Sequence, residues 1–233
     1  MVYLENPAQY SALADELAWE KTYAAEAEIR RRRNPFLYRA ARFPKAVWQR
    51  LLGRDKLVSW AEHYFAPGPV LDVGCSDGHT LERLPRQFVP YGIEISAELS
   101  RLAQERFARR GGRVVKGDAL SALGQFDAGF FTGVIMTGFL EHEPEPCAVL
   151  AAARRVMRPN SCLIVKVPNY GSWNRGVRGA RWCGFRFPDH VNYFTPPGLR
   201  ALLVQAGFQV LRFGILDRFP TSDNMWLIAG RNP

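Results

Sequence analysis

The chain has 233 residues, of which 47% are hydrophobic and 23% are charged, and this balance is typical of a globular protein. No stretch approaches the roughly 20 uninterrupted apolar residues that a membrane span requires, and the first residues lack the basic and apolar regions of a secretory signal. We therefore expect a cytoplasmic protein with no membrane span. The formal net charge of +9 makes an anionic partner worth considering.

Residues 1–66 are predicted to form an N-terminal helical arm. Residues 8–33 are rich in Ala, Glu, Leu and Arg, and residues 46–64 show a second helical pattern. The densest basic run, at residues 30–33, fits an anionic partner, but it also fits the last turn of a solvated helix, where cations interact favourably with the helix dipole. The proline and glycine residues at 67–69 then break the chain, and we place the domain boundary there.

Residues 67–233 are predicted to form the main domain, in which strands alternate with helices. The strand patterns lie at residues 70–73, 88–95, 113–118, 126–137, 161–168, 208–216 and 225–232. The helix patterns lie at residues 80–84, 96–112, 145–160 and 195–207, with Ser96 as the expected N-cap of the second. This alternation predicts an α/β fold with a doubly wound, mostly parallel, seven-stranded sheet.

A short loop with two glycines follows the first strand of the domain. Asp72, Gly74 and Gly78 stand in the stretch VLDVGCSDG, directly before a helix pattern. Glycine lets the backbone turn tightly and approach a ligand, and open α/β sheets bind ligands at the carboxyl ends of their strands. A dinucleotide fingerprint fails because Ser76 and His79 replace its second and third glycines, and a P-loop fails because its lysine is missing.

Two further acids, Glu94 and Asp118, follow the next two strands. An acid at the end of the second strand is well placed to accept hydrogen bonds from both ribose hydroxyls. Carboxylates near the loop would repel a pyrophosphate and favour a cationic ligand. The loop and its acids therefore indicate a nucleoside that carries positive charge.

Five segments in order, VLDVGCSDG, YGIEIS, VVKGDAL, FLEHEPEP and RRVMRPNSCLIVKVPN, resemble the motifs of class I S-adenosylmethionine-dependent methyltransferases. The resemblance runs from Pro69 to the end of the chain and is strongest to the small-molecule branch with a Leu-Glu-His motif after the fourth strand. It implies a Rossmann-like methyltransferase fold and S-adenosyl-L-methionine as the cofactor, with Glu94 on the ribose hydroxyls and Asp118 facing the adenine amine. The cofactor-binding residues that it implies are Asp72, Gly74, Ser76, Gly78, Glu94, Ile95, Asp118, Ala119 and Thr137.

The sequence departs from this family at three points. Ser76 replaces the middle glycine of the loop, and we expect it to keep an ordinary backbone angle, with the loop slightly reshaped or the hydroxyl bonded to the ligand. The fourth strand has two registers, beginning near Phe126 or near Phe130, and the family spacing favours the later one, with Asp127 in the preceding loop. Some relatives bind a divalent metal through the Glu-His pair and an acid three residues before the Glu. The corresponding residue here is Gly138, so we expect no metal site.

Residues 168–195 lack a clear helix or strand pattern and are predicted to form a lid over the methyl acceptor. Aromatic and basic side chains alternate there: Trp173, Arg175, Arg178, Arg181, Trp182, Phe185, Arg186, Phe187, Tyr193 and Phe194. Such a mixture suits an anionic or glycosylated acceptor. The alternative is that the aromatic side chains form the core of the lid itself.

His142 and His190 are the candidate catalytic residues. An acceptor oxygen with a high pKa needs a base, and imidazole titrates near neutrality. The alternatives are that His142 forms a hydrogen bond with Glu141 at the start of the following helix and that His190 is a structural residue of the lid.

The predicted function is the transfer of a methyl group from S-adenosyl-L-methionine to an oxygen or nitrogen of a small molecule. An RNA or protein methyltransferase is one alternative, but the Asn-Pro-Pro-Tyr type of signature is absent after the fourth strand, which makes nucleic acid an unfavoured partner. The other alternative is a cofactor-binding partner subunit without its own turnover.

Overall fold

The computed structural model describes residues 2–3 and 55–232. The chain divides into two compact units, one of residues 8–59 and one of residues 1–7 and 60–233. The predicted helix at 8–33, the basic run within it and residues 46–54 of the second predicted helix lie outside the described residues. The described part of that second helix is α4 (Lys56–Tyr64).

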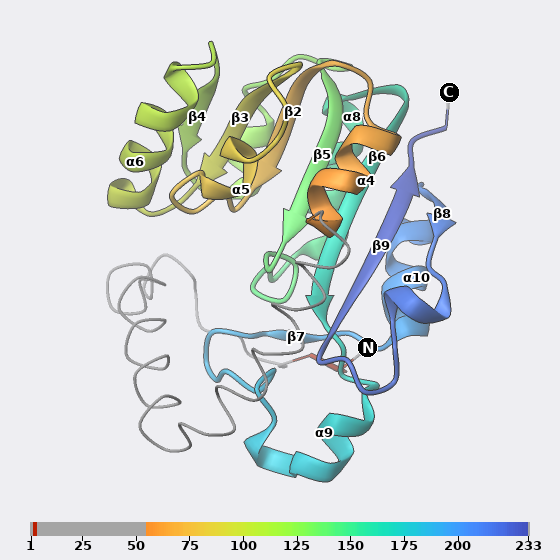
Figure 1. The fold of residues 1–233 in the computed structure, drawn as a ribbon. Coiled ribbons are helices and arrows are strands. Elements are labelled where there is room, and N and C mark those ends of the chain that lie inside the picture. The colour runs from red at the N-terminus through yellow and green to blue at the C-terminus, as the bar shows by residue number, and fades with distance from the viewer. Residues whose placement is uncertain (1, 4–54, 233) are drawn as a thin grey trace. The chain divides into compact units, whose positions relative to one another are not determined.

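Seven strands form one sheet in the order β4-β3-β2-β5-β6-β9-β8 (Figure 1). The parallel strands are β2 (Gly68–Val73), β3 (Phe88–Glu94), β4 (Arg113–Lys116), β5 (Phe131–Thr137) and β6 (Met157–Pro168). The antiparallel strands are β9 (Asn224–Gly230) next to β6 and β8 (Gln209–Arg212) next to β9. The predicted mostly parallel, seven-stranded sheet is confirmed.

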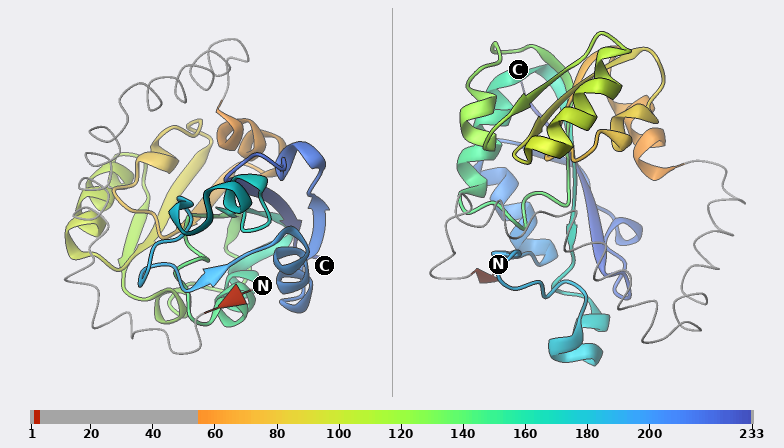
Figure 2. Two further views of the ribbon diagram at one scale, coloured as in Figure 1. Left: turned by 90° about the horizontal axis from the view of Figure 1, so that it is seen from below. Right: turned by 90° about the vertical axis from the view of Figure 1, so that its left-hand side faces the viewer.

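Helices cover both faces of this sheet (Figures 1 and 2). They are α5 (His79–Glu82), α6 (Ala97–Ala108), α7 (Ala119–Leu123), α8 (Pro146–Val156) and α10 (Pro196–Gln205). Helix α6 packs on β3 and β4, whereas α8 and α10 contact each other on the opposite face. Leu71, Val134 and Leu163 of the sheet share one buried cluster with Val149 of α8 and Leu203 of α10, so burial of apolar surface holds this layer in place. None of the described helices has both the length and the apolar character needed to cross a membrane.

Several local predictions can be compared with the structure. Ser96 caps α6, because its Oγ accepts a hydrogen bond from the Leu99 amide at 3.3 Å. Strand β5 begins at Phe131, so the later register is correct and Asp127 lies in the preceding loop. The helix predicted to reach residue 160 was wrong at its end: α8 stops at Val156, and residues 157–160 belong to β6. Pro159 explains this end, since proline disfavours helix both at its own position and at the one before.

The lid segment contains regular structure that its sequence pattern did not indicate. It holds α9 (Trp173–Arg178), the 3-10 turn η1 (Gly179–Arg181) and the short strand β7 (Asn192–Tyr193). Strand β1 (Val2–Tyr3) pairs with β7 in an antiparallel two-stranded sheet, visible in Figure 2 as a red strand beside the light blue one. The start of the chain is therefore joined to the lid.

Candidate functional site

The predicted cofactor residues gather at one edge of the sheet. Strands β2 to β5 are parallel, so their carboxyl ends meet at the same edge. Strand β2 pairs with β3 on one side and with β5 on the other, and β4 lies beyond β3. The direction of winding therefore reverses between β2 and β5, which makes this the switch point where open α/β sheets bind ligands.

The glycine loop is fastened to the end of β3. The amides of Gly74 and Cys75 both donate to the carbonyl oxygen of Ile93, at 2.9 and 3.0 Å. Gly74 has a φ of +75°, and a Cβ at this position would lie 2.9 Å from the Phe139 ring. Glycine is thus required both by the turn and by the close approach of the loop that follows β5.

Ser76 corrects one expectation. Its φ is +51°, in the left-handed region that non-glycine residues seldom adopt, rather than an ordinary angle. Two hydrogen bonds hold this conformation: the Ser76 amide donates to Glu94 Oε2 at 2.8 Å, and the Gly78 amide donates to the Cys75 carbonyl oxygen at 2.9 Å. The loop therefore keeps a glycine-like path with serine in the middle position.

Glu94 is oriented by the backbone on both sides. Its Oε2 accepts from the Ser76 amide and its Oε1 accepts from the Ser96 amide at 2.9 Å, while the residue is only 9% exposed. A carboxylate oxygen has more than one lone-pair site, so acceptance from an amide does not limit it to that one hydrogen bond. The loop and the carboxylate thus form one preorganised unit.

Asp118 has a structural role that its sequence context did not reveal. Its Oδ1 accepts from the Ser121 amide at 2.9 Å and caps α7, and this hydrogen bond lowers the pKa of the Asp118 carboxyl. Ala119, the first residue of α7, is buried, whereas Ile95 and Thr137 are half-buried at the ends of β3 and β5. All four lie at the predicted edge of the sheet.

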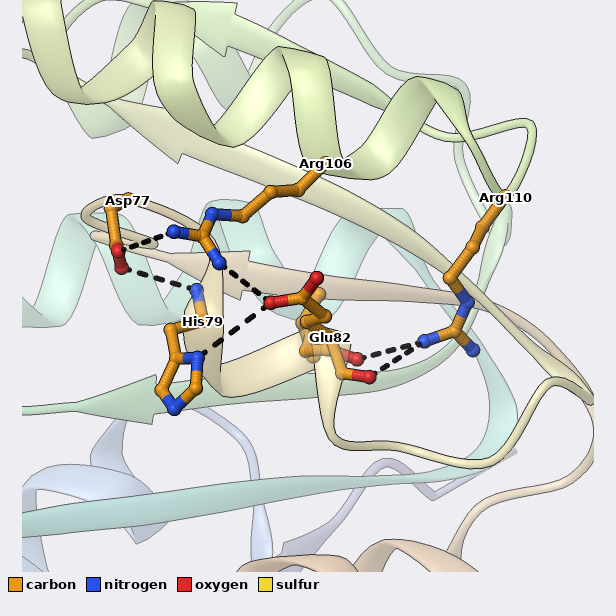
Figure 3. A network of polar contacts seen from close by, with 6 residues as sticks. Asp77, His79, Glu82, Arg106 and Arg110 are labelled. Atoms are coloured by element: carbon orange, nitrogen blue, oxygen red, sulfur yellow. Dashed lines mark hydrogen bonds and ion pairs between the residues drawn. The ribbon is translucent and has the colours of Figure 1, made fainter.

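The far side of the glycine loop is tied to α6 by a surface network (Figure 3). Arg106 bridges Asp77 at 3.1 Å and Glu82 at 2.6 Å, and the His79 amide donates to Asp77 Oδ1 at 3.2 Å. Arg110 donates to the backbone carbonyl oxygens at the end of α5. Arg106 therefore compensates the charges of Asp77 and Glu82 and holds the loop against α6.

Asp72 is buried beneath the loop. It is 1% exposed, and its Oδ1 has no hydrogen-bond partner in the part of the chain that the structure describes. Burial, and then the charge of Glu94, raise the pKa of Asp72 well above its ordinary value. Ionisation of this carboxyl is therefore unfavourable in the folded protein without ligand.

This burial predicts a stability gain for Asp72→Asn. In the unfolded chain an aspartate carboxyl has a pKa of about 3.9, whereas in the folded protein the pKa of Asp72 is higher. Between these two pKa values only the folded protein keeps the proton, so the free energy of unfolding falls as pH rises through this range. The asparagine side chain does not titrate, so the variant does not lose this stability. We expect calorimetric scans to give a higher Tm for the variant at pH 7, by about 2–4 °C for each kcal/mol regained, and a smaller difference at pH 5. A Tm difference that is constant across this range would contradict the assignment.

A second group of side chains lies beyond β5. Glu141 and His142 follow this strand and His190 comes from the lid, and one nitrogen or carboxylate oxygen from each lies within 4.8 Å of the others. The two imidazole rings meet edge to face, with centroids 4.6 Å apart. We call these three residues the Glu-His-His cluster. Both predicted catalytic histidines are thus brought together, 48 positions apart in the chain.

Hydrogen bonds fix the orientation of both rings. His142 Nδ1 lies 3.0 Å from the backbone oxygen and 3.0 Å from Oδ1 of Asp189, and His190 Nδ1 lies 2.8 Å from the Gly184 carbonyl oxygen. A carbonyl oxygen only accepts, so each Nδ1 carries the hydrogen, and in the neutral ring Nε2 has the free lone pair. Burial and the nearby His142 lower the pKa of His190 to about 4, whereas for His142 the effect of burial is outweighed by Asp189 and Glu141, which raise its pKa.

Glu141 joins the cluster to the lid. Its backbone oxygen accepts from the amides of Val191 and Asn192 at 2.8 and 3.0 Å, and the Asn192 side chain donates to the carbonyl oxygens of Leu140 and Glu143 at 3.0 and 2.6 Å. Its carboxyl is buried, which raises its pKa, and its Oε2 has no hydrogen-bond partner among the described residues. The sequence carried no signal for the role of Asn192.

The lid aromatic side chains divide into two groups. Trp182 and Tyr193 are buried, and both rings lie against the Tyr170 ring, which favours the interpretation that they form a core of the lid. Phe194 is also buried, but it belongs to the main core of the sheet domain. Trp173 and Phe187 are 67% and 80% exposed. Among the arginines, Arg175 stacks on Tyr170 at 4.5 Å and Arg178 lies 3.7 Å from Asp223.

Comparison with known proteins gives relatives of one kind. The ubiquinone biosynthesis O-methyltransferase of Xanthomonas axonopodis pv. citri (strain 306) is 28% identical over 151 residues, which cover 60% of this chain and 62% of that protein. The protein of that name from Burkholderia pseudomallei (strain 1710b) is 26% identical over 164 residues, 66% of this chain and 71% of that one. The chain thus matches slightly less than two-thirds of the length of the first of these relatives.

Solved structures show the same fold. A SAM-dependent methyltransferase from Methanosarcina mazei matches with a TM-score of 0.58 and 20% identity, covering 73% of this chain and 96% of that one. A SAM dependent methyltransferase from Archaeoglobus fulgidus matches with a TM-score of 0.57 and 18% identity, covering 81% and 93%. The family model described as a methyltransferase domain matches residues 36–212, well over half of the chain. The chain therefore belongs to the methyltransferase-domain family, as its motifs predicted.

Proposed function

We propose that this protein transfers the methyl group of S-adenosyl-L-methionine to an oxygen of a small molecule. The observation that carries the proposal is that two sets of groups share one edge of the sheet: the glycine loop with Glu94, and the Glu-His-His cluster next to it after β5. The names of the curated relatives, which are O-methyltransferases, support oxygen rather than nitrogen as the methylated atom.

The residues of the loop suit a cationic nucleoside. The segment from Gly74 to Gly78 has no basic side chain, and the carboxylate of Glu94 is held in place beside it by the Ser76 and Ser96 amides. The buried Asp72 adds, beneath the loop, an oxygen to which no described residue donates a hydrogen bond. When bound, S-adenosyl-L-methionine supplies an activated methyl group on a positively charged sulfur, and negative side chains favour that charge.

The proposal gives each cofactor residue a role. Glu94 accepts hydrogen bonds from the ribose hydroxyls, and the Asp118 oxygen that does not cap α7 accepts from the adenine amine. The backbone from Gly74 to Gly78, with Ser76, lies against the methionyl and ribose part, above Asp72. Ile95, Ala119 and Thr137 supply packing contacts at the same edge.

The Glu-His-His cluster serves the acceptor in this proposal. Methyl transfer is an in-line displacement, which depends mainly on the alignment of the two substrates. A hydroxyl also has to lose its proton. The cluster offers to the reacting oxygen two imidazole Nε2 atoms and one carboxylate oxygen, none of which has a hydrogen-bond partner among the described residues. His142 and His190 therefore activate the acceptor hydroxyl.

Two measurements test this function. Calorimetry with S-adenosylhomocysteine should give saturable binding, with a dissociation constant of about 1 μM to 1 mM, the range in which enzyme KM values usually fall. Labelled S-adenosyl-L-methionine, offered with a panel of phenols and vicinal diols, should label at least one of them. The matched control is the same compound with its hydroxyl already methylated, which should stay unlabelled.

The outcomes that contradict the proposal differ in kind. Absence of S-adenosylhomocysteine binding would remove the cofactor assignment. Binding without transfer to any acceptor would favour a partner subunit. Label found in RNA or protein but in no small molecule would favour a polymer methyltransferase.

A further inference from the structure

We propose that Glu141, His142 and His190 bind a divalent transition-metal cation that activates the acceptor hydroxyl. The inference rests on the proposed function and states how the Glu-His-His cluster performs it. It also revises the expectation of no metal site, which followed from the glycine at position 138. The lid supplies His190 as the third ligand in place of an acid at that position.

The positions of the three side chains fit a cation. One ligand atom from each residue lies within 4.8 Å of the other two. Metal–ligand bonds of about 2.0–2.2 Å hold ligand atoms within roughly 4 Å of one another, so a contraction of about 1 Å or less forms the site. Three protein ligands leave coordination positions open for the oxygen of the acceptor, as in catalytic rather than structural metal sites.

The hydrogen bonds around the two histidines are those of metal-bound imidazoles. A ligating histidine almost always donates its other ring N–H to a carboxylate or a backbone carbonyl. His142 Nδ1 has Asp189 as its partner and His190 Nδ1 has the Gly184 carbonyl oxygen, so both partners are already in place. Both Nε2 atoms are left as the ligand atoms.

Glu141, the third ligand, has a buried carboxylate oxygen that needs a partner, and a cation would supply one. Glu141 is 4% exposed, and no described residue donates a hydrogen bond to its Oε2. A buried acceptor without a partner costs about 1–3 kcal/mol. The positive charge of Lys166 attracts this carboxyl, but the Lys166 ammonium lies 5.5 Å from the Trp226 ring centroid and provides no such bond. Coordination would give Oε2 its missing partner.

The ligand types select the class of ion. Imidazole suits zinc, copper, iron and nickel, whereas magnesium and calcium prefer oxygen ligands. We therefore expect a first-row transition ion such as zinc or cobalt. A hydroxyl bound to such an ion loses its proton more readily: the O–H bond breaks, the proton goes to solvent, and the electron pair stays on the oxygen that accepts the methyl group. The ion is neither oxidised nor reduced.

Cobalt is a suitable probe because its visible spectrum reports the number and type of ligands. The full chain, treated with EDTA and dialysed, should bind one equivalent of Co²⁺ in calorimetry and develop visible absorption bands. We expect Glu141→Gln and His190→Gln each to weaken this binding at least 100-fold. Asp189→Asn, which alters only the partner of His142, should weaken it by about 10- to 100-fold.

Matched controls come from residues outside the cluster. His63→Gln and Glu98→Gln make the same chemical changes on α4 and α6 and should leave Co²⁺ binding unchanged. Cys183→Ser removes the exposed thiol of the lid and should also have no effect. A Tm close to that of the unaltered protein will show that each cluster variant is folded, and His190→Gln alone suffices if Glu141→Gln unfolds.

Two results would overturn the metal site. One is the absence of saturable Co²⁺ binding by the unaltered protein, and the other is binding that survives Glu141→Gln and His190→Gln. Activity separates this inference from the function on which it rests. Full methyl transfer by the EDTA-treated protein would exclude the cation but keep the methyltransferase, whereas loss of S-adenosylhomocysteine binding would exclude the methyltransferase itself.

Discussion

Replacement of His142 by alanine is expected to lower kcat by about 10²- to 10⁴-fold, the range that a group acting on the reacting proton contributes. The His142 ring is aligned by two contacts with Asp189 and lies against His190, so its loss removes one imidazole and frees the other. The loss is expected whether the ring takes the proton or holds a cation. Kinetics with the best acceptor from the panel will measure it.

The cofactor should be nearly unaffected by this change. The His142 ring is hydrogen-bonded to Asp189 and not to the glycine loop or Glu94, so S-adenosylhomocysteine should bind to the variant with the dissociation constant of the unaltered protein. His63→Ala, on α4, is the matched control and should retain full turnover. A kcat for His142→Ala equal to that of the unaltered protein would make His142 a structural residue of the loop after β5.

Replacement of Glu94 by alanine is expected to weaken cofactor binding, which His142→Ala leaves nearly unchanged. The carboxylate receives two backbone amides and is proposed to receive the ribose hydroxyls, so its removal costs cofactor affinity directly and also releases the Ser76 turn. A hydrogen bond to a charged group is worth about 1.5–3 kcal/mol, so the net loss of one such bond raises the dissociation constant by about 10- to 150-fold. Calorimetry with S-adenosylhomocysteine provides the measurement.

A graded series makes the assignment of Glu94 sharper. Glu94→Gln keeps one acceptor oxygen and should lie between the alanine variant and the unaltered protein. Glu98→Ala removes a carboxylate from the exposed face of α6, where it pairs with Arg101, and should leave the affinity unchanged. An unchanged dissociation constant for Glu94→Ala would place the ribose elsewhere.

Most of the fold followed from local patterns. Apolar runs, Ser96 as a cap and the spacing to the Leu-Glu-His motif were enough to predict the sheet and the register of β5, because each depends on neighbours in the chain. Helix α7 was missed since Asp118 was interpreted as a ligand residue alone, although an acid three positions before Ser121 is also a cap. Pro159 was the available signal for the end of α8.

The site was less predictable because its parts come together only in the folded chain. Ser76 could be identified as a departure from the family, but its positive φ depends on Glu94, which is 18 positions away. His142 and His190 could each be named as candidates, whereas their contact depends on Asn192 and on the return of the lid to Glu141. The Gly138 position indicated a missing ligand, and no local pattern could show that a lid histidine lies close to the remaining two.

The pairing of β1 with β7 affects the order in which the molecule is completed. Val2 and Tyr3 are synthesised long before their partners Tyr193 and Asn192. Such a contact closes a very long loop and forms only two residue pairs, so its entropic cost is large relative to the free energy that the pairing contributes. We infer that the pairing of β1 with β7 forms after the sheet and opens before it on heating, and amide hydrogen exchange in β1 should be faster than in β5.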